Sequence, residues 1–367
     1  MTKECRRASN GKAETVPQGS LYACNVPDVF RRYTACMLVG PTARPNVMFM
    51  SRGVFAAESC VVADVRPSPN HGERSGGVRP DMILLHYTGM ADAAAALERL
   101  CAPGSDVSAH YLVLEDGRVI QMVQENRRAW HAGASFWAAQ TDINSCSIGI
   151  EIANPGHDFG YPHFPKRQIA AVTALCRGIQ TRYTIPPARV LAHSDVAPSR
   201  KQDPGEKFPW QTLWDSGVGH WVHPAPISEG GTVLTLGDRG DAVTEAQDLL
   251  SKYGYGVTAT GTYDSNTHDV VKALQRHFRP ERVDGMLDVS TRTTLQDLFN
   301  QRGRVRTVGA RARDNGRLAS RRRRCASPSL LPSVNRTAAP ARPKGCRGGK
   351  SGLHGQTVPD NIRRARA

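Results

Sequence analysis

Residues 82–88 read Met-Ile-Leu-Leu-His-Tyr-Thr, a dense apolar run that ends in polar residues. A run of this length and composition predicts a buried strand, and it places His86 at the end of that strand. Two further runs have the same character: Ser-Ile-Gly-Ile-Glu-Ile-Ala over 147–153, and Val-Leu-Ala over 190–192, which leads directly into His193. Strand ends are where a folded scaffold presents functional side chains, so these three strands mark the candidate site.

Helical and hairpin patterns lie between these strands. An Ala-rich stretch over 91–101 and an apolar repeat over 166–183 both have helical spacing, and residues 109–123 form two strand-like runs around Glu115-Asp116-Gly117. The Asp-Gly step predicts a hairpin turn. Strands mixed with helices over 64–221 therefore predict an α/β or α+β domain.

A second, smaller domain is expected at 233–300, after a Pro- and Gly-rich linker at 222–232. Three amphipathic helices are predicted there, at 241–253, 265–278 and 290–299. Two similar turn-to-helix entries separate them, which indicates an internal pseudo-repeat. Residues 1–63 show no sustained periodicity and are expected to form a poorly ordered leader.

The charge of the chain is concentrated in one segment. Residues 301–367 hold 18 of the 48 lysines and arginines but only two of the 33 acidic residues, so residues 1–300 carry a net charge of −1. We expect this basic tail to be disordered and to bind polyanions only non-specifically. A nearly neutral folded part argues against specific nucleic-acid binding. There is no transmembrane run, and we expect a monomer.

The loop at 193–205 combines a histidine, two aspartates and a lysine with two prolines and a glycine. His193 and Asp203 can close on one metal ion, and His86 would complete a set of three ligands. Two imidazoles, one carboxylate and a water form a catalytic zinc arrangement. For each histidine the alternative is a hydrogen-bonded structural residue, and Asp195 in the same loop is predicted to form a turn.

Four other positions are candidates for chemistry or binding. Glu151 lies within an apolar strand, where burial would raise its pKa and suit it to act as a general base; the alternative is a solvent-facing glutamate on an edge strand. Lys201 can donate to a developing oxyanion, or it is a solvated loop residue. Trp130 and His131 fit the wall of a sugar- or peptide-binding groove, and the alternative for Trp130 is a core residue. We assign a substrate contact to Asn154 as well.

These segments resemble the type 2 family of zinc-dependent N-acetylmuramoyl-L-alanine amidases, and within it the AmpD/AmiD branch. The similar segments follow the family order: 84–88, 107–113, 128–133, 147–151 and 193–205. The resemblance implies an α/β fold with a mixed central β-sheet flanked by helices. It also implies that His86, His193 and Asp203 bind Zn²⁺, that Glu151 handles the proton of the attacking water, and that Lys201 faces the oxyanion. Residues 233–299 resemble a three-helix peptidoglycan-binding domain, through Leu-Gly-Asp-Arg-Gly-Asp-Ala-Val at 236–243 and Gly-Thr-Tyr-Asp at 261–264.

The implied function is hydrolysis of the amide bond between N-acetylmuramic acid and the L-alanine of the stem peptide, with peptidoglycan or muropeptides as partners. The alternative is a non-catalytic peptidoglycan-recognition protein, but binding-only relatives lose a zinc ligand and this chain keeps all three. The wall-binding domain favours the cell envelope. The sequence has no clear signal peptide, which leaves muropeptide recycling in the cytoplasm as the other expectation.

Overall fold

The apolar runs at 82–88, 147–153 and 190–192 form three adjacent strands, β3, β7 and β8, at one end of a six-stranded sheet with the order β1-β5-β4-β7-β3-β8. The computed structural model describes residues 55–301. All neighbouring strands of this sheet are parallel except the hairpin partners β4 and β5. The strands are β1 (Val62–Val65), β3 (Met82–Tyr87), β4 (Tyr111–Val113), β5 (Val119–Gln121), β7 (Ser147–Ile152) and β8 (Val190–Ala192).

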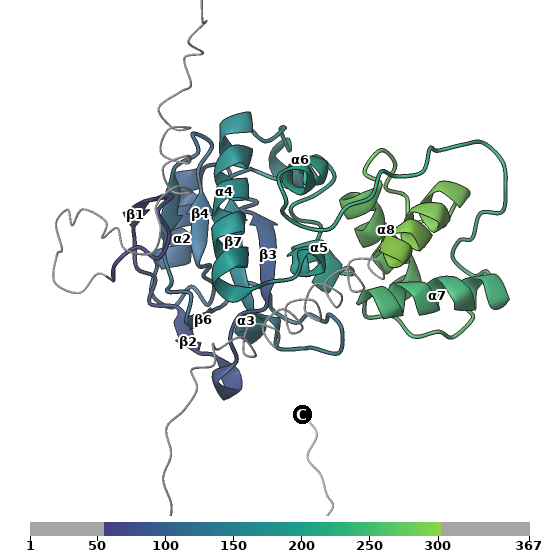
Figure 1. Cartoon of the computed structure of the whole chain (residues 1–367), viewed down its shortest axis with the longest axis horizontal. Coiled ribbons are helices and arrows are strands. Elements are labelled where there is room, and N and C mark those ends of the chain that lie inside the picture. Colours follow the sequence, from purple (N-terminus) through teal and green to yellow (C-terminus); the bar gives the residue numbers. More distant parts are fainter. Residues whose placement is uncertain (1–54, 302–367) are drawn as a thin grey trace, which may run out of the picture. The chain divides into compact units, whose positions relative to one another are not determined.

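Helices cover both faces of the sheet. Helix α4 (Lys166–Tyr183) lies across one face (Figure 1), where its apolar stripe shares a core with Ile148, Ile150 and Ile152 of β7. Helix α2 (Ala93–Cys101) packs on Leu112 and Ile120, whose side chains point to the opposite face because side chains alternate along a strand. The same alternation turns Gly149 and Glu151 of β7 away from α4.

Short elements complete this region. Strands β2 (His71–Glu73) and β6 (Arg127–Ala129) form a separate antiparallel pair. The short helices are η1 (Ser75–Gly77), α3 (Ile143–Cys146), η2 (His157–Phe159), η3 (Pro187–Arg189), α5 (His193–Val196) and α6 (Trp210–Asp215). Within residues 55–301, no helix combines the length and apolar character that a membrane span needs.

The predicted α/β class is confirmed, and each predicted strand and helix of the central sheet region has a counterpart in the structure. Three details differ from expectation. β1 begins inside the segment assigned to the leader, β2 and β6 were not predicted, and residues 193–196 form one helical turn where a loop was expected. β1 is short and half-exposed, with Asp64 in its middle, so it lacks the apolar run that marks the buried strands. Residues 1–54 of the predicted leader, and the basic tail beyond 301, lie outside the described residues.

The C-terminal region is helical, as predicted. It contains α7 (Asp241–Tyr253), α8 (Ser265–Phe278) and a third helix over 289–301. Asp264 caps α8 by accepting a hydrogen bond from the backbone N–H of Thr267 at 2.8 Å. Isolated bridges between Leu234 and Leu287, and between Arg239 and Thr262, close the loops around these helices.

The internal repeat of this region is made by two buried glutamines with equivalent roles. Gln247 of α7 accepts hydrogen bonds from the backbone N–H groups of Thr260 and Gly261, and it donates to the carbonyl of Thr262 at 2.9 Å. Gln275 of α8 binds the loop 284–286 in the same way. Each side-chain amide therefore hydrogen-bonds the backbone N–H and C=O groups of a tight turn that leads into the next helix.

Replacing Gln275 with leucine should destabilise the folded chain strongly. The change leaves the buried N–H of Gly285 and the partly buried N–H of Asp284 without acceptors, and a buried group of this kind costs about 1–3 kcal/mol. Denaturant unfolding followed by circular dichroism measures the loss. Gln296→Leu is the matched control, since Gln296 is exposed on the third helix and donates only to the side chain of Asn300. Equal losses for the two variants would contradict this account of the repeat.

Candidate active site

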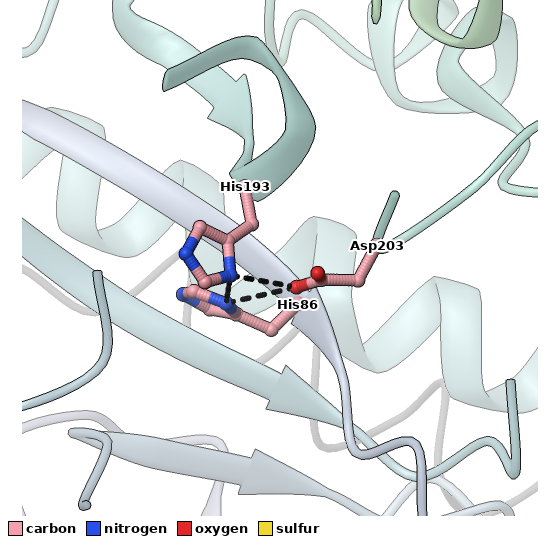
Figure 2. A group of neighbouring side chains, drawn as sticks. All are labelled: His86, His193 and Asp203. Atoms are coloured by element: carbon pink, nitrogen blue, oxygen red, sulfur yellow. Dashed lines mark hydrogen bonds and ion pairs between the residues drawn. The ribbon is translucent and has the colours of Figure 1, made fainter. Parts of the chain in front are cut away.

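Three side chains from separate parts of the chain converge on one point (Figure 2). His86 comes from the end of β3, His193 begins α5 directly after β8, and Asp203 comes from the following loop. The Nδ1 atoms of the two histidines are 3.0 Å apart, and Asp203 Oδ2 lies 3.1 Å from Nδ1 of His86 and 3.0 Å from Nδ1 of His193. All three residues are buried.

The loop 193–205 closes on itself so that its two candidate ligands meet. The backbone N–H of Ser194, next to His193, donates to the carbonyl oxygen of Asp203 at 3.0 Å. The Tyr161 hydroxyl donates to the carbonyl oxygen of Pro204 at 2.7 Å. Gly205 has a φ of +84°, and a Cβ there would lie 2.2 Å from the Tyr161 hydroxyl. The glycine is required both by its backbone conformation and by this close contact.

Each histidine is held through its second ring nitrogen. Nε2 of His193 donates to the carbonyl oxygen of Ala132 at 3.0 Å, and Nε2 of His86 lies 3.1 Å from Nδ1 of His131. A proton on each Nε2 leaves the Nδ1 lone pairs facing the cluster. His131 itself lies over Gly149, where any Cβ would come within 2.5 Å of the imidazole ring.

Burial and mutual interaction fix the charges of the cluster. Burial, together with the neighbouring His193, lowers the pKa of His86 to about 4. Burial also lowers the pKa of His131 well below its usual value, with His86 acting in the same direction. Burial raises the pKa of Asp203, but the two histidines outweigh that effect and hold it well below the ordinary range. At neutral pH His86 and His131 are therefore neutral imidazoles, and Asp203 is a carboxylate.

This donor set suits a divalent metal ion. Two imidazole nitrogens and one carboxylate oxygen are the ligands of catalytic zinc sites, and bonds of about 2.0–2.1 Å in a tetrahedron put ligand atoms about 3.3 Å apart. The three donor atoms found here are 3.0–3.1 Å apart. Each histidine also has the outer hydrogen-bond partner that metal-binding imidazoles normally have. The residues therefore fit a metal held by three protein ligands.

Glu151 lies beside the cluster because β3 and β7 are paired in parallel, with His86 directly opposite Glu151. Its buried Oε2 has no hydrogen-bond partner among the described residues. Burial, aided by the charge of Asp203, raises the pKa of Glu151 well above its usual value, although Lys201 acts in the opposite direction. A partly unsatisfied carboxyl group with a raised pKa is typical of a catalytic proton carrier.

A cavity of about 560 Å³ opens over these groups. Seven of the eight predicted site residues line it: His86, Glu151, His193, Asp203, Lys201, His131 and Trp130. Trp130 is half-buried, with its backbone anchored on Ser108. His131 has a second role, since it orients His86. These functional assignments remain predictions.

Asn154 is the predicted site residue that does not line this cavity. Its side chain donates to the carbonyl oxygen of Pro162 at 3.0 Å and accepts from the backbone N–H of Gly156 at 2.9 Å. Both polar groups of the amide are thus engaged within its own loop. A substrate contact for Asn154 stays a prediction that these bonds do not support.

Sequence reasoning missed Tyr87 as a cavity residue. Its hydroxyl lies 3.0 Å from Nδ1 of His157, and Nε2 of His157 lies 3.1 Å from Glu206. Burial raises the pKa of Tyr87 to about 12, so it faces the cavity as a neutral phenol. The only signal in the sequence was its position directly after His86. Its contacts with His157 and, through it, Glu206 are too distant in sequence to form a recognisable motif.

Comparison with known proteins gives matches that run through both folded regions. Residues 76–206 match the family model of N-acetylmuramoyl-L-alanine amidase, and residues 239–295 match that of a peptidoglycan binding domain. The chain is 35% identical over 240 residues to the N-acetylmuramoyl-L-alanine amidase AmiD of Escherichia coli, covering 61% of this chain and 84% of AmiD. It is 33% identical over 162 residues to the 1,6-anhydro-N-acetylmuramyl-L-alanine amidase AmpD of Citrobacter freundii, covering 39% of this chain and 84% of AmpD.

Solved structures agree with these matches. The complex of E. coli AmiD with anhydro-N-acetylmuramic acid-L-Ala-D-γ-Glu-L-Lys superposes with a TM-score of 0.51 at 32% identity, covering 63% of this chain and 98% of that one. AmpDh3 of Pseudomonas aeruginosa gives a TM-score of 0.52 at 30% identity, covering 70% and 99%.

An α/β domain with this site, joined to a helical wall-binding module, defines a peptidoglycan hydrolase. The chain belongs to the N-acetylmuramoyl-L-alanine amidase family. Its reaction is cleavage of the amide bond between N-acetylmuramic acid and the L-alanine of the stem peptide.

Replacing Gly149 with alanine should reduce amidase activity about 10- to 100-fold, the usual effect of losing an outer partner of a metal-binding histidine. The new Cβ would displace the His131 ring and leave His86 without its Nε2 acceptor. Hydrolysis of a soluble muropeptide measures the effect. Gly72→Ala is the control, because a Cβ at Gly72 meets nothing within 4 Å. Full activity of Gly149→Ala would show that His131 does not orient His86.

Proposed function

We propose that this amidase is a zinc enzyme in which His86, His193 and Asp203 bind the ion through Nδ1, Nδ1 and Oδ2. The observation that carries the proposal is the distance of 3.0–3.1 Å between each pair of these three atoms. In addition, Nε2 of each imidazole has a hydrogen-bond partner that orients the ring. Three lone-pair donors at this separation are stabilised by a shared cation.

Bound zinc would supply a water of lowered pKa and would polarise the scissile carbonyl group. Glu151 is placed to take the proton of the attacking water, because its carboxyl group lies next to His86 across the β3–β7 register. Its raised pKa then suits it to return a proton to the nitrogen of the departing L-alanine. One group thus acts first as base and then as acid.

Lys201 is proposed to stabilise the negative oxygen that develops on the attacked carbonyl. Its ammonium group belongs to the same cavity, and its charge acts on both Glu151 and His86. A fixed positive charge in a partly dehydrated site stabilises an oxyanion more than it would in water. Trp130 and His131 also line this cavity, and we propose that they contact the sugar or the stem peptide.

The substrate class is proposed to be muropeptides, including anhydro-muropeptides, and peptidoglycan strands. AmiD was solved with an anhydro-muramyl tripeptide, and AmpD is named for the 1,6-anhydro substrate. A cavity of about 560 Å³ is within the range that small ligands occupy. The C-terminal domain would hold the enzyme on polymeric wall and raise the local substrate concentration.

Asp203→Ala should abolish both zinc binding and amidase activity, because it removes the one anionic ligand of the three and leaves two imidazoles. Zinc content is measured by elemental analysis after dialysis, and hydrolysis by mass spectrometry of a purified muropeptide. Mass spectrometry also identifies the bond that is cut. Asp64→Ala is the control, since Asp64 is exposed on β1 and far from the cluster in the sheet order. Release of free stem peptide by Asp203→Ala at the wild-type rate would refute the metal assignment.

Glu151→Gln should separate catalysis from metal binding. The amide keeps the shape of the carboxyl group but cannot carry a proton, so kcat should fall about 10²- to 10⁴-fold while zinc remains bound. Single-turnover hydrolysis and zinc content are measured on the same sample. A variant that keeps its kcat would remove Glu151 from the proton path.

A further inference from the structure

We propose that the C-terminal domain helps to position a metal ligand, in addition to binding the cell wall. Tyr255 and His277 are positioning residues: they bind Asp195, which fixes helix α5 and therefore His193. This inference rests on the proposed metal site. It assigns Asp195 a role beyond the turn that the sequence indicated.

Asp195 is the point of contact. Its side chain is 0% exposed and accepts three hydrogen bonds. Oδ2 binds the backbone N–H of Ala192 at 2.8 Å and Nδ1 of His277 at 2.7 Å, while Oδ1 binds the Tyr255 hydroxyl at 2.8 Å. The first bond caps α5 locally, as predicted for a turn residue. The other two come from the C-terminal helical region.

The two donors are themselves held rigidly by aromatic packing. Tyr255 and His277 are each 1% exposed. The His277 ring stacks on Trp210 of the catalytic region with centroids 3.7 Å apart, and Tyr255 meets Trp137 edge-on at 4.9 Å. Such packing leaves the donors few alternative positions, so the bonds to Asp195 fix its place.

A second contact supports the same conclusion. The backbone N–H of Ala138 donates to the carbonyl oxygen of Gly254 at 2.8 Å. Gly254 has a φ of +139°, and a Cβ there would come within 2.5 Å of the Trp137 indole. The loop that ends α7 therefore lies directly against the segment around Trp137. That segment follows Ala132, whose carbonyl oxygen accepts the hydrogen bond from Nε2 of His193.

The geometry transmits any displacement to the candidate ligands. Helix α5 spans only four residues, begins at His193, and contains both Asp195 and Ser194. The Ser194 N–H holds the carbonyl group of Asp203, so a shift of α5 moves two of the three metal-binding side chains. Loss of a donor also leaves a buried carboxylate short of a partner, which drives the helix to rearrange.

The test compares full-length, zinc-loaded Tyr255→Phe with Tyr263→Phe. Tyr263 is a matched control because its buried hydroxyl donates to the carbonyl oxygen of Gly285, entirely within the C-terminal region. Zinc affinity is measured by competition with a chromophoric chelator, kcat and KM on a soluble muropeptide, and wall binding by sedimentation with purified peptidoglycan sacculi.

Tyr255→Phe should weaken zinc binding about 10- to 100-fold and lower kcat with KM unchanged, as expected for loss of an outer support of a metal ligand. Tyr263→Phe should leave zinc affinity and kcat at wild-type values. Both variants should still sediment with sacculi. Wild-type zinc affinity and kcat in Tyr255→Phe would overturn the proposal. His277→Gln provides a second variant with the same expectation.

A metal-free measurement separates this inference from the proposed function. Hydrogen exchange of the apoprotein should show faster exchange at residues 192–197 in Tyr255→Phe than in Tyr263→Phe. If the wild-type chain bound no zinc, the proposed function would fail while this difference could still be observed. If exchange at 192–197 were the same in both variants, the coupling through Asp195 would be refuted.

Discussion

Parallel pairing of β3 with β7 on one side and β8 on the other is the constraint on which the rest of the site depends. Parallel strands end at the same edge of a sheet, so residues that are distant in sequence arrive together. His86 lies opposite Glu151 in the β3–β7 register, and His193 follows the last paired residue of β8. A shift of one residue in either register would turn one of these side chains to the face covered by α4.

Burial gives these polar groups their chemical character. A carboxylate, two imidazoles and a second carboxyl group in a partly dehydrated pocket cannot all keep their ordinary protonation. The pKa of His86 falls, that of Glu151 rises, and Asp203 keeps its charge because the histidines surround it. The same environment therefore supports both proposed roles, a charged carboxylate at Asp203 for the metal and a carboxyl group of raised pKa at Glu151 for proton transfer.

Two other buried polar arrangements have a comparable structural role. Gln247 and Gln275 each satisfy the backbone of a turn in the C-terminal region, which makes the repeat visible as hydrogen bonds. Asp195 accepts a hydrogen bond from the backbone N–H of Ala192 at the start of α5, and it also binds Tyr255 and His277. In both cases a short polar side chain fixes a loop that apolar packing alone would leave undefined.

The sequence by itself determined the buried strands, the helices, and the residue types able to bind a metal, because apolar runs, helical spacing and Pro/Gly loops are local signals. It also supplied the ordered motifs that resemble the amidase family. Tertiary structure alone decided the short half-exposed strand β1, the second role of His131 behind His86, the internal engagement of Asn154, and the contact of Asp195 with Tyr255 and His277. Each of these depends on partners far apart in the chain, and only the folded packing brings those partners together.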